Sequence, residues 1–121
     1  MFKFTIYGRL PTLNEYTKVS RSNKYASASM KSNAEKEILT NIALTKTGAA
    51  KPPYFITFVW NEKTKRRDKD NVCFAKKFIL DALQKGGYIE NDSNKYILGF
   101  KDLFSYGRSQ SVDVTIEGSD D

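Results

Sequence analysis

The segment Lys65-Arg66-Arg67-Asp68-Lys69-Asp70-Asn71 sets two carboxylates within a run of basic residues. Neighbouring carboxylates repel each other, and a hard divalent cation held between them removes the repulsion while staying open to phosphate oxygens and water. The flanking cations would attract a polyanionic backbone. The pattern therefore suggests metal-assisted hydrolysis of a phosphodiester. The alternative is that Asp68 and Asp70 only cap a helix, because Asp and Asn are favoured at helix starts.

The composition excludes most other catalytic chemistry. The chain has no histidine, which removes imidazole as a general base, as a partner of a nucleophile and as a zinc ligand. Its single cysteine, Cys73, can form neither an internal disulfide nor a cysteine zinc cluster, and we expect it to be a small packed residue. Catalysis would depend on carboxylates, lysine or metal, in a reducing, cytoplasmic setting.

The charge balance favours a polyanionic partner. Lys and Arg outnumber Asp and Glu by 20 to 14, which gives a formal charge of +6. Excess positive charge releases counterions when it meets phosphates, an attraction that needs no particular base sequence. No apolar stretch approaches the roughly 20 residues of a membrane span, and no leader is visible at the amino terminus. We therefore expect a nucleic acid partner and no membrane.

The hydrophobic pattern predicts one α/β domain over residues 1–121, with two main helices packed on a mixed sheet in the order β-α-β-α-β-β. The strands are expected at residues 2–7, 54–60, 95–106 and 111–117, and the helices at about 30–47 and from about 68 to the Gly86-Gly87 pair. Residues 8–29 lack a pattern and are expected to form a long polar loop, and the acidic tail, 118–121, to be frayed.

Helical geometry organises the second predicted helix. At about 100° per residue, positions seven and eleven along return close to the starting angle, so Lys77 and Asp81 are expected beneath Asp70. The opposite side carries an apolar stripe, and three further apolar residues indicate that a second side is covered too. The stripe comprises Val72, Ala75, Ile79, Ala82 and Leu83, and the further residues are Phe74, Phe78 and Leu80.

Several motifs in the second half of the chain resemble those of the RusA-type Holliday-junction resolvases. They are Arg66-Arg67-Asp68-Lys69-Asp70-Asn71, Asp81-Ala82-Leu83-Gln84-Lys85-Gly86-Gly87 and Asn91-Asp92. Leu10-Pro11-Thr12-Leu13-Asn14 also resembles the family's Pro-x-x-Asn element, so the likeness spans most of the chain. The resemblance implies a homodimer that binds four-way junctions in DNA recombination and repair and makes paired, symmetric nicks with Mg²⁺. The family often serves phages and prophages.

Carried over by position, the resemblance implies that Asp68, Asp70 and Asp92 bind the metal, Mg²⁺ or Mn²⁺, and that Lys77 is the active-site lysine. Between Asn71 and Asp81 this chain has a few more residues than the best-known members, and counting back from Asp81 gives Lys77. Lys76 remains the second candidate. Without the resemblance, Asp92 would be read as part of an Asn91 to Asn94 turn.

The other basic and polar residues near these motifs are predicted to bind DNA arms through phosphates, which position the substrate without reading bases. They are Asn14, Lys18, Arg21, Lys24, Lys65, Arg66, Arg67, Lys69 and Lys76. No small-molecule cofactor is expected. Two other functions remain open: a non-catalytic module that binds branched DNA, and a flap or RNA nuclease with the same metal cluster.

Overall fold

Alternating apolar side chains build the centre of the sheet. In the computed structural model, which describes residues 1–121, the central strands are β1 (Phe2–Tyr7), β5 (Ser111–Glu117) and β3 (Tyr54–Glu62). In each of them every second side chain is buried on one face of the sheet. Alternation with a period of two is what places those residues against a single core. The strand predictions at 2–7 and 111–117 are confirmed, and the third strand runs to Glu62.

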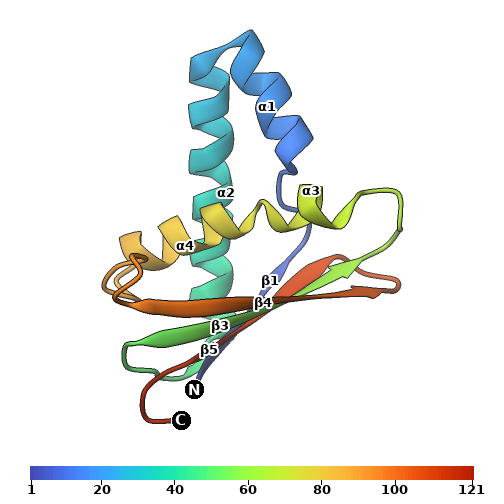
Figure 1. The fold of residues 1–121 in the computed structure, drawn as a ribbon. Coiled ribbons are helices and arrows are strands. Elements are labelled where there is room, and N and C mark those ends of the chain that lie inside the picture. Colours follow the sequence, from blue (N-terminus) through green and yellow to red (C-terminus); the bar gives the residue numbers. More distant parts are fainter.

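The sheet is mixed, with five strands in the order β2-β1-β5-β3-β4 (Figure 1). β5 pairs antiparallel with both β1 and β3, and the two-residue strand β2 (Thr47–Gly48), which the sequence pattern did not predict, pairs antiparallel with β1. β4 (Ile97–Tyr106) pairs parallel with β3 and forms the opposite edge. A parallel pair needs a crossover connection, and helices supply it here.

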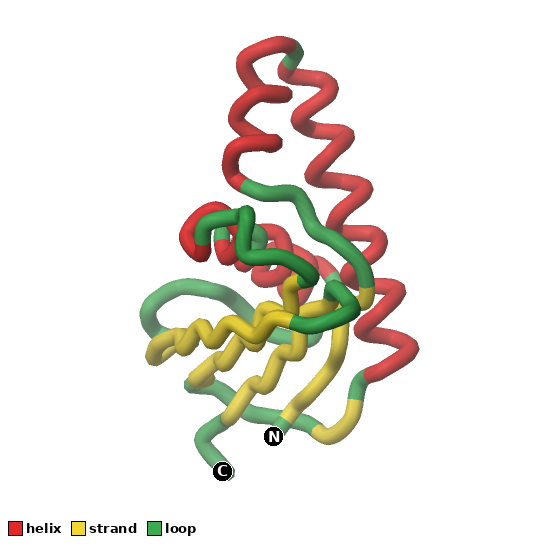
Figure 2. Tube along the Cα trace, turned by 90° about the vertical axis from the view of Figure 1, so that its right-hand side faces the viewer, coloured by secondary structure: helices red, strands yellow, loops and turns green.

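Helices cover one face of this sheet. α3 (Lys69–Cys73) and α4 (Lys76–Lys85) make the crossover between β3 and β4, while the carboxyl-terminal part of α2 (Lys24–Thr45) packs against β1 and α4. α1 (Leu13–Ser22) and the first half of α2 form a hairpin that stands out from the sheet (Figures 1 and 2). The molecule thus has a packed body and a projecting helical arm.

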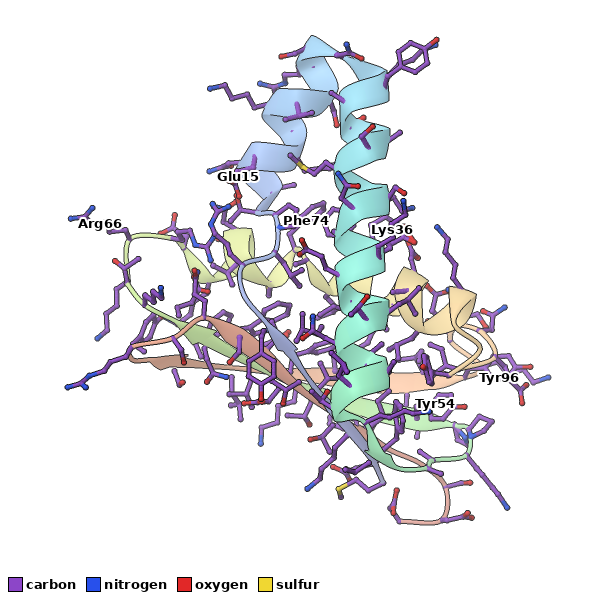
Figure 3. All side chains as sticks on the ribbon, turned by 180° about the vertical axis from the view of Figure 1, so that it is seen from behind. Glu15, Lys36, Tyr54, Arg66, Phe74 and Tyr96 are labelled. Atoms are coloured by element: carbon purple, nitrogen blue, oxygen red, sulfur yellow. The ribbon has the colours of Figure 1, made fainter.

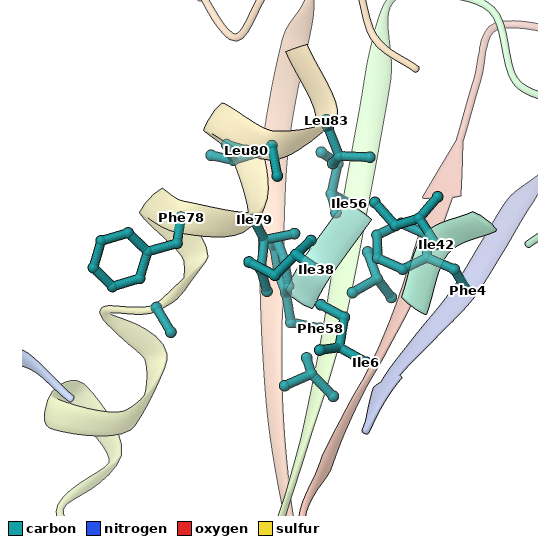
Figure 4. Packing of buried hydrophobic residues seen from close by; sticks show 14 of the residues in the cluster. Phe4, Ile6, Ile38, Ile42, Ile56, Phe58, Phe78, Ile79, Leu80 and Leu83 are labelled. Atoms are coloured by element: carbon teal, nitrogen blue, oxygen red, sulfur yellow. The ribbon is translucent and has the colours of Figure 1, made fainter. Parts of the chain in front are cut away.

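The core lies between α2, α4 and the sheet (Figure 4). Ile38 and Ile42 of α2 and Ile79 and Leu83 of α4 are completely buried. They pack with side chains from β1 and β3, including Phe4, Ile6, Ile56 and Phe58. The predicted apolar stripe of the second helix is buried throughout. Of the three further apolar residues expected to be covered, Phe78 and Leu80 are buried and Phe74 is partly buried.

The predicted loop at residues 8–29 is wrong, because most of that segment is helical. Thr12 and Glu15 form a capping box at the start of α1, in which each side chain accepts a backbone N–H from the other residue. The Asn23 side chain then caps α2 by accepting from Tyr25 and Ala26, so α2 begins at Lys24 and not near residue 30. Ser32 and Glu35 have the spacing of a capping box, which favours a helix start near residue 30, but both lie inside α2.

Two further expectations differ from the structure. The single helix predicted from about 68 to 86 is two helices, because the N–H groups of Ala75, Lys77 and Phe78 bond three residues back and tighten the turn between α3 and α4. The tail is tied down instead of frayed. The Ser119 N–H donates to the Lys51 carbonyl at 2.9 Å, and the Gly118 N–H donates to the Asp121 carboxylate at 2.8 Å.

None of the helices combines the length and the apolar character needed to cross a lipid bilayer.

The capping box gives a prediction about acid sensitivity. Burial opposes ionisation of Glu15, but bonds from Thr12 and Arg9 outweigh it and hold the pKa of this carboxyl below its usual value. Its stabilising effect is therefore present above the unfolded-state pKa and is lost as the pH falls through the folded-state pKa. Glu15→Gln should lower the free energy of unfolding by about 0.5 kcal/mol at pH 7 and by much less at pH 3.

Urea unfolding at both pH values measures this difference. Glu37→Gln is the matched control, because Glu37 is an exposed carboxylate of α2 without an ion pair. A Glu15→Gln deficit of the same size at pH 3 as at pH 7 would contradict the role given to the ionised carboxylate.

Candidate metal and nucleic-acid site

Asp68 and Asp70 lie at the start of α3, where the chain returns from the end of β3 toward the sheet. Asp68 is at the helix N-cap position with extended backbone angles, but its side chain makes no capping hydrogen bond. Asp70 accepts one local hydrogen bond, from the Asn71 N–H at 3.0 Å. Both carboxylates are exposed, and neither has a salt-bridge partner. The capping alternative therefore does not account for the Asp68 side chain.

The neighbouring cations do not neutralise these two carboxylates, because most of them are engaged elsewhere. The Arg67 guanidinium turns inward and donates to Glu62 Oε1 from Nε at 2.9 Å and from Nη2 at 2.6 Å. The ammonium group of Lys69 lies over the rings of Phe104 and Tyr106 at the end of β4. The basic segment thus folds so that its acids stay unpaired.

Lys76 occupies the space between α4 and the sheet. Its Nζ is 2.6 Å from Asp102 Oδ2, and it lies 5.4 and 4.8 Å from the ring centroids of Phe58 and Phe100. Asp102 Oδ1 also accepts a hydrogen bond from Trp60 Nε1 at 2.9 Å. Lys76, predicted to be a DNA contact and the second candidate for the active-site lysine, is therefore held within the domain.

Cys73 lies near this ion pair. Burial raises the pKa of its thiol, and the negative charges of Asp102 and Asp70 raise it further against the opposing effect of Lys76. A thiol that resists ionisation is a poor nucleophile. This agrees with the expectation that Cys73 is a packed residue.

Lys77 points to the other side of the helix pair. It is exposed and lines a hollow between α1 and the α3–α4 segment. Asp81, which was expected on the same stripe, pairs instead with Lys31 of α2 at 3.0 Å. The bond to Asp81 raises the pKa of Lys31 above its usual value, although partial burial opposes this. Lys77 and Asp81 still share one side of α4, four residues apart, and the tight turn between α3 and α4 changes only their angular relation to Asp70.

Asp92 lies far from Asp68 and Asp70 within one chain. It is in the turn before β4, where the Asn91 side chain accepts the Ser93 N–H and the Asp92 carboxylate makes no hydrogen bond. β4 is ten residues long, so its two ends are about 30 Å apart. Arg66 and Tyr96, which flank the two regions, lie at opposite ends of the sheet (Figure 3). A single chain brings no three carboxylate, cysteine or histidine groups together for a metal ion.

The remaining predicted DNA contacts fall into two groups. Lys18, Arg21 and Lys24 are exposed on the projecting hairpin, where no acidic residue occurs between positions 16 and 34. Lys65 and Arg66 are exposed in the loop before α3, as is Lys69 in its first turn. Asn14 lies between the two groups. Its backbone N–H donates to Asn71 Oδ1 at 2.8 Å and so ties the start of α1 to α3. Arg67 belongs to neither, since its guanidinium is bound to Glu62.

Two residues that shape this region were not predicted. Glu62 holds Arg67, and Asp102 holds Lys76. Alternation along β4 could have identified Asp102, because it lies two residues from both Phe100 and Phe104 and therefore shares their face.

The sequence matches no protein-family model, and no curated protein matches it. The resemblance to the RusA-type resolvases stays a prediction from motif residues.

The Glu62–Arg67 pair gives a prediction about stability. The Glu62 side chain is 7% exposed and that of Arg67 is 17% exposed, so removing Glu62 would strand a nearly buried guanidinium. Glu62→Ala should lower the free energy of unfolding by about 3 kcal/mol, because breaking a buried pair costs more than the pair contributes. Urea unfolding measures the loss. Glu117→Ala, at an exposed and unpaired strand position, is the control, and equal losses in the two variants would refute the structural role of the pair.

Proposed function

We propose that this protein is a Mg²⁺-dependent endodeoxyribonuclease that resolves four-way DNA junctions by paired nicks. One observation carries the proposal: Asp68 and Asp70 remain without a cationic partner in the most basic segment of the chain. Exposed carboxylates beside lysine and arginine would lower their energy by pairing. Here Arg67 is bound by Glu62 and Lys69 lies over the β4 aromatic rings, so neither of these cations is paired with Asp68 or Asp70.

The two carboxylates suit a Mg²⁺ ion. Proteins commonly bind Mg²⁺ through one or two carboxylates, with water and substrate phosphates completing the octahedron. When bound, the ion would act as a Lewis acid toward a phosphate oxygen and make a nearby water a better nucleophile. Mn²⁺ could replace it. Asp68 and Asp70 would hold the ion, and no histidine is required.

The other residues would bind and position the DNA backbone. Arg66, in the loop before α3, and Lys77, at the hollow beside α1, are exposed cations, and the hairpin cations extend the positive surface away from the body. Contacts of this type give affinity and register without reading bases. A branched substrate offers phosphates in more than one direction, which suits a surface divided between a body and a projecting arm.

A homodimer would complete the site. β4 is an edge strand of ten residues whose outer backbone groups have no partner. Leu98, Phe100, Leu103 and Tyr106 on this strand are exposed apolar side chains. Long, exposed and apolar edges favour pairing with another strand. We infer that β4 pairs antiparallel with β4 of a second copy across a twofold axis, which continues the sheet.

That arrangement bears directly on Asp92. Antiparallel pairing sets the start of one β4 beside the end of the other, and the end of β4 is where Lys69 contacts Phe104 and Tyr106. Asp92 of the partner subunit would then approach Asp68 and Asp70. Two such sites related by a twofold axis match the two equivalent strands of a four-way junction.

A non-catalytic module that binds branched DNA is the second candidate. The absence of a three-carboxylate group within one chain favours it. The positive hairpin would bind DNA in either case, so only a measurement of DNA cleavage distinguishes the nuclease from the binding module.

Substitution of Asp70 distinguishes the two candidates. Asp70→Asn should reduce the rate of nicking of a synthetic four-way junction in Mg²⁺ by at least about 100-fold, because it removes one of the two metal-binding charges. Junction binding in a Ca²⁺ buffer should persist within about twofold of the wild type, since the phosphate-binding cations are unchanged.

Glu90→Gln is the matched control, because Glu90 is also an exposed and unpaired carboxylate. It should cleave like the wild type. Cleavage by Asp70→Asn at the wild-type rate would exclude the proposed site, and a wild type that binds but never nicks would favour the binding module.

Mixed dimers test whether Asp92 acts across the interface. Asp70→Asn and Asp92→Asn should each be inactive alone. In a dimer of one chain of each kind, one site carries both substitutions and the other carries none. Chains mixed in equal amounts and allowed to exchange should therefore recover nicking at about a quarter of the wild-type rate, because half of the dimers are mixed and each mixed dimer has one intact site of two. If Asp92 served its own chain, both sites would carry a substitution and no activity would return.

A further inference from the structure

A hollow of about 410 Å³ lies between α1 and the α3–α4 segment. Its walls include the aromatic rings of Tyr16 and Phe74, whose centroids are 5.6 Å apart at an interplanar angle of 38°. Tyr16 also packs against Phe78, which fixes it from the side of α4. The hollow therefore presents a firm aromatic surface and has the size of a small-molecule pocket, which is typically about 300–1,000 Å³.

Two cations border the same hollow. Arg21 comes from α1 and Lys77 from α4, both are exposed, and neither forms a salt bridge. Thr17 and Ser20 line the α1 side. No acidic residue lines the hollow. An apolar aromatic wall bordered by unpaired cations is complementary to a planar base attached to a phosphate.

The hollow adjoins the candidate metal site. Leu13 lines it, and the next residue, Asn14, donates its N–H to Asn71 Oδ1 on α3. Phe74 follows Asp70 by four residues, which corresponds to a rise of about 6 Å along a helix and to roughly the same side of it. A nucleotide in the hollow would thus be a near neighbour of a phosphate held at Asp70.

The larger cavity on the other side of α1, of about 700 Å³, lacks this chemistry. It is lined by no aromatic residue, and its one cation, Arg9, is paired with Glu15 at 2.6 Å. Glu37 adds a further negative charge there. The carboxylates in its lining would repel a phosphate, so the two cavities beside α1 differ in the ligands that they can bind.

We propose that the hollow between α1 and α3–α4 binds one unstacked nucleotide of the strand being cut, next to the scissile phosphate. The base would stack on Tyr16 and Phe74, while Arg21 and Lys77 bind its flanking phosphates. This inference rests on the proposed nuclease function and adds a feature of the substrate. Bases in a closed duplex are stacked and paired, so the site selects DNA that is open at the cut, as it is at a branch point.

Filling the hollow tests the proposal. Ser20→Trp places a bulky side chain in it, and Ser29→Trp places the same side chain in the larger cavity, at another exposed serine of the hairpin. Each variant and the wild type are titrated with junctions in Ca²⁺. The junctions carry a single abasic residue at successive positions on both sides of the mapped cut.

The proposal predicts one position at which an abasic residue weakens wild-type binding about tenfold, because stacking on an aromatic ring contributes that much. Ser29→Trp should show the same loss. Ser20→Trp should bind the intact junction about tenfold more weakly and show no further loss with the abasic residue. If the Ser20→Trp substitution and the abasic residue remove the same contact, their effects on affinity do not add. If Ser20→Trp only disturbed α1, the abasic residue would weaken binding further.

Arg21→Gln provides a second variant that leaves the hollow open. It should weaken binding and lower the slope of log affinity against log salt by about one, with Lys36→Gln on α2 as the control. If Ser20→Trp binds, cleaves and responds to abasic residues like Ser29→Trp, the subsite is refuted while the nuclease remains. A wild type that neither binds nor cuts the junction would overturn the proposed function itself.

Discussion

The unpaired negative charge of Asp68 and Asp70 is the feature on which the proposed function depends. The segment that contains them is rich in cations, and a flexible chain would be expected to fold back and pair them. The fold gives two of those cations other partners. Glu62, at the buried end of β3, binds Arg67, and the aromatic end of β4 takes Lys69. The unpaired charge is thus a product of the tertiary structure and not of local sequence.

The parallel crossover from β3 through α3 and α4 to β4 determines how far apart the three predicted metal ligands lie. It places Asp68 and Asp70 at one end of β4 and the turn with Asp92 at the other. A strand of this length separates its ends by more than any metal coordination sphere can span. Three carboxylates from one chain therefore cannot meet. The topology therefore limits a metal site within one chain to Asp68 and Asp70, and Asp92 could contribute only from a second copy.

The sequence predicted the central strands well, because alternation along Phe2 to Tyr7 and along Ser111 to Glu117 reflects burial on one face. It failed where local signals competed. The Thr12 to Glu15 capping box marks the start of α1, but few apolar residues follow it, and none in α1 is buried. The directions in which Lys76 and Lys77 point depend on the tight turn between α3 and α4. No residue in that turn signals it, and Ala75 is itself a strong helix former that favours a continuous helix.

The sequence predicted only part of the candidate site, because the rest depends on contacts between elements that are distant in the chain. Asp68 and Asp70 stand out by type and spacing, and their exposure follows from a polar segment. The engagement of Arg67 and Lys76 by Glu62 and Asp102 depends on contacts between distant elements. Sequence could assign these cations a charge but not a partner.

Binding of Mn²⁺ in the absence of DNA tests the central claim most directly. Electron paramagnetic resonance measures free Mn²⁺, so a titration of the protein reports how much is bound. The wild type should remove Mn²⁺ from the free signal, and Asp70→Asn should remove far less at the same concentration, because the unpaired charge is reduced. Equal binding by the two proteins, or none by the wild type, would contradict the claim.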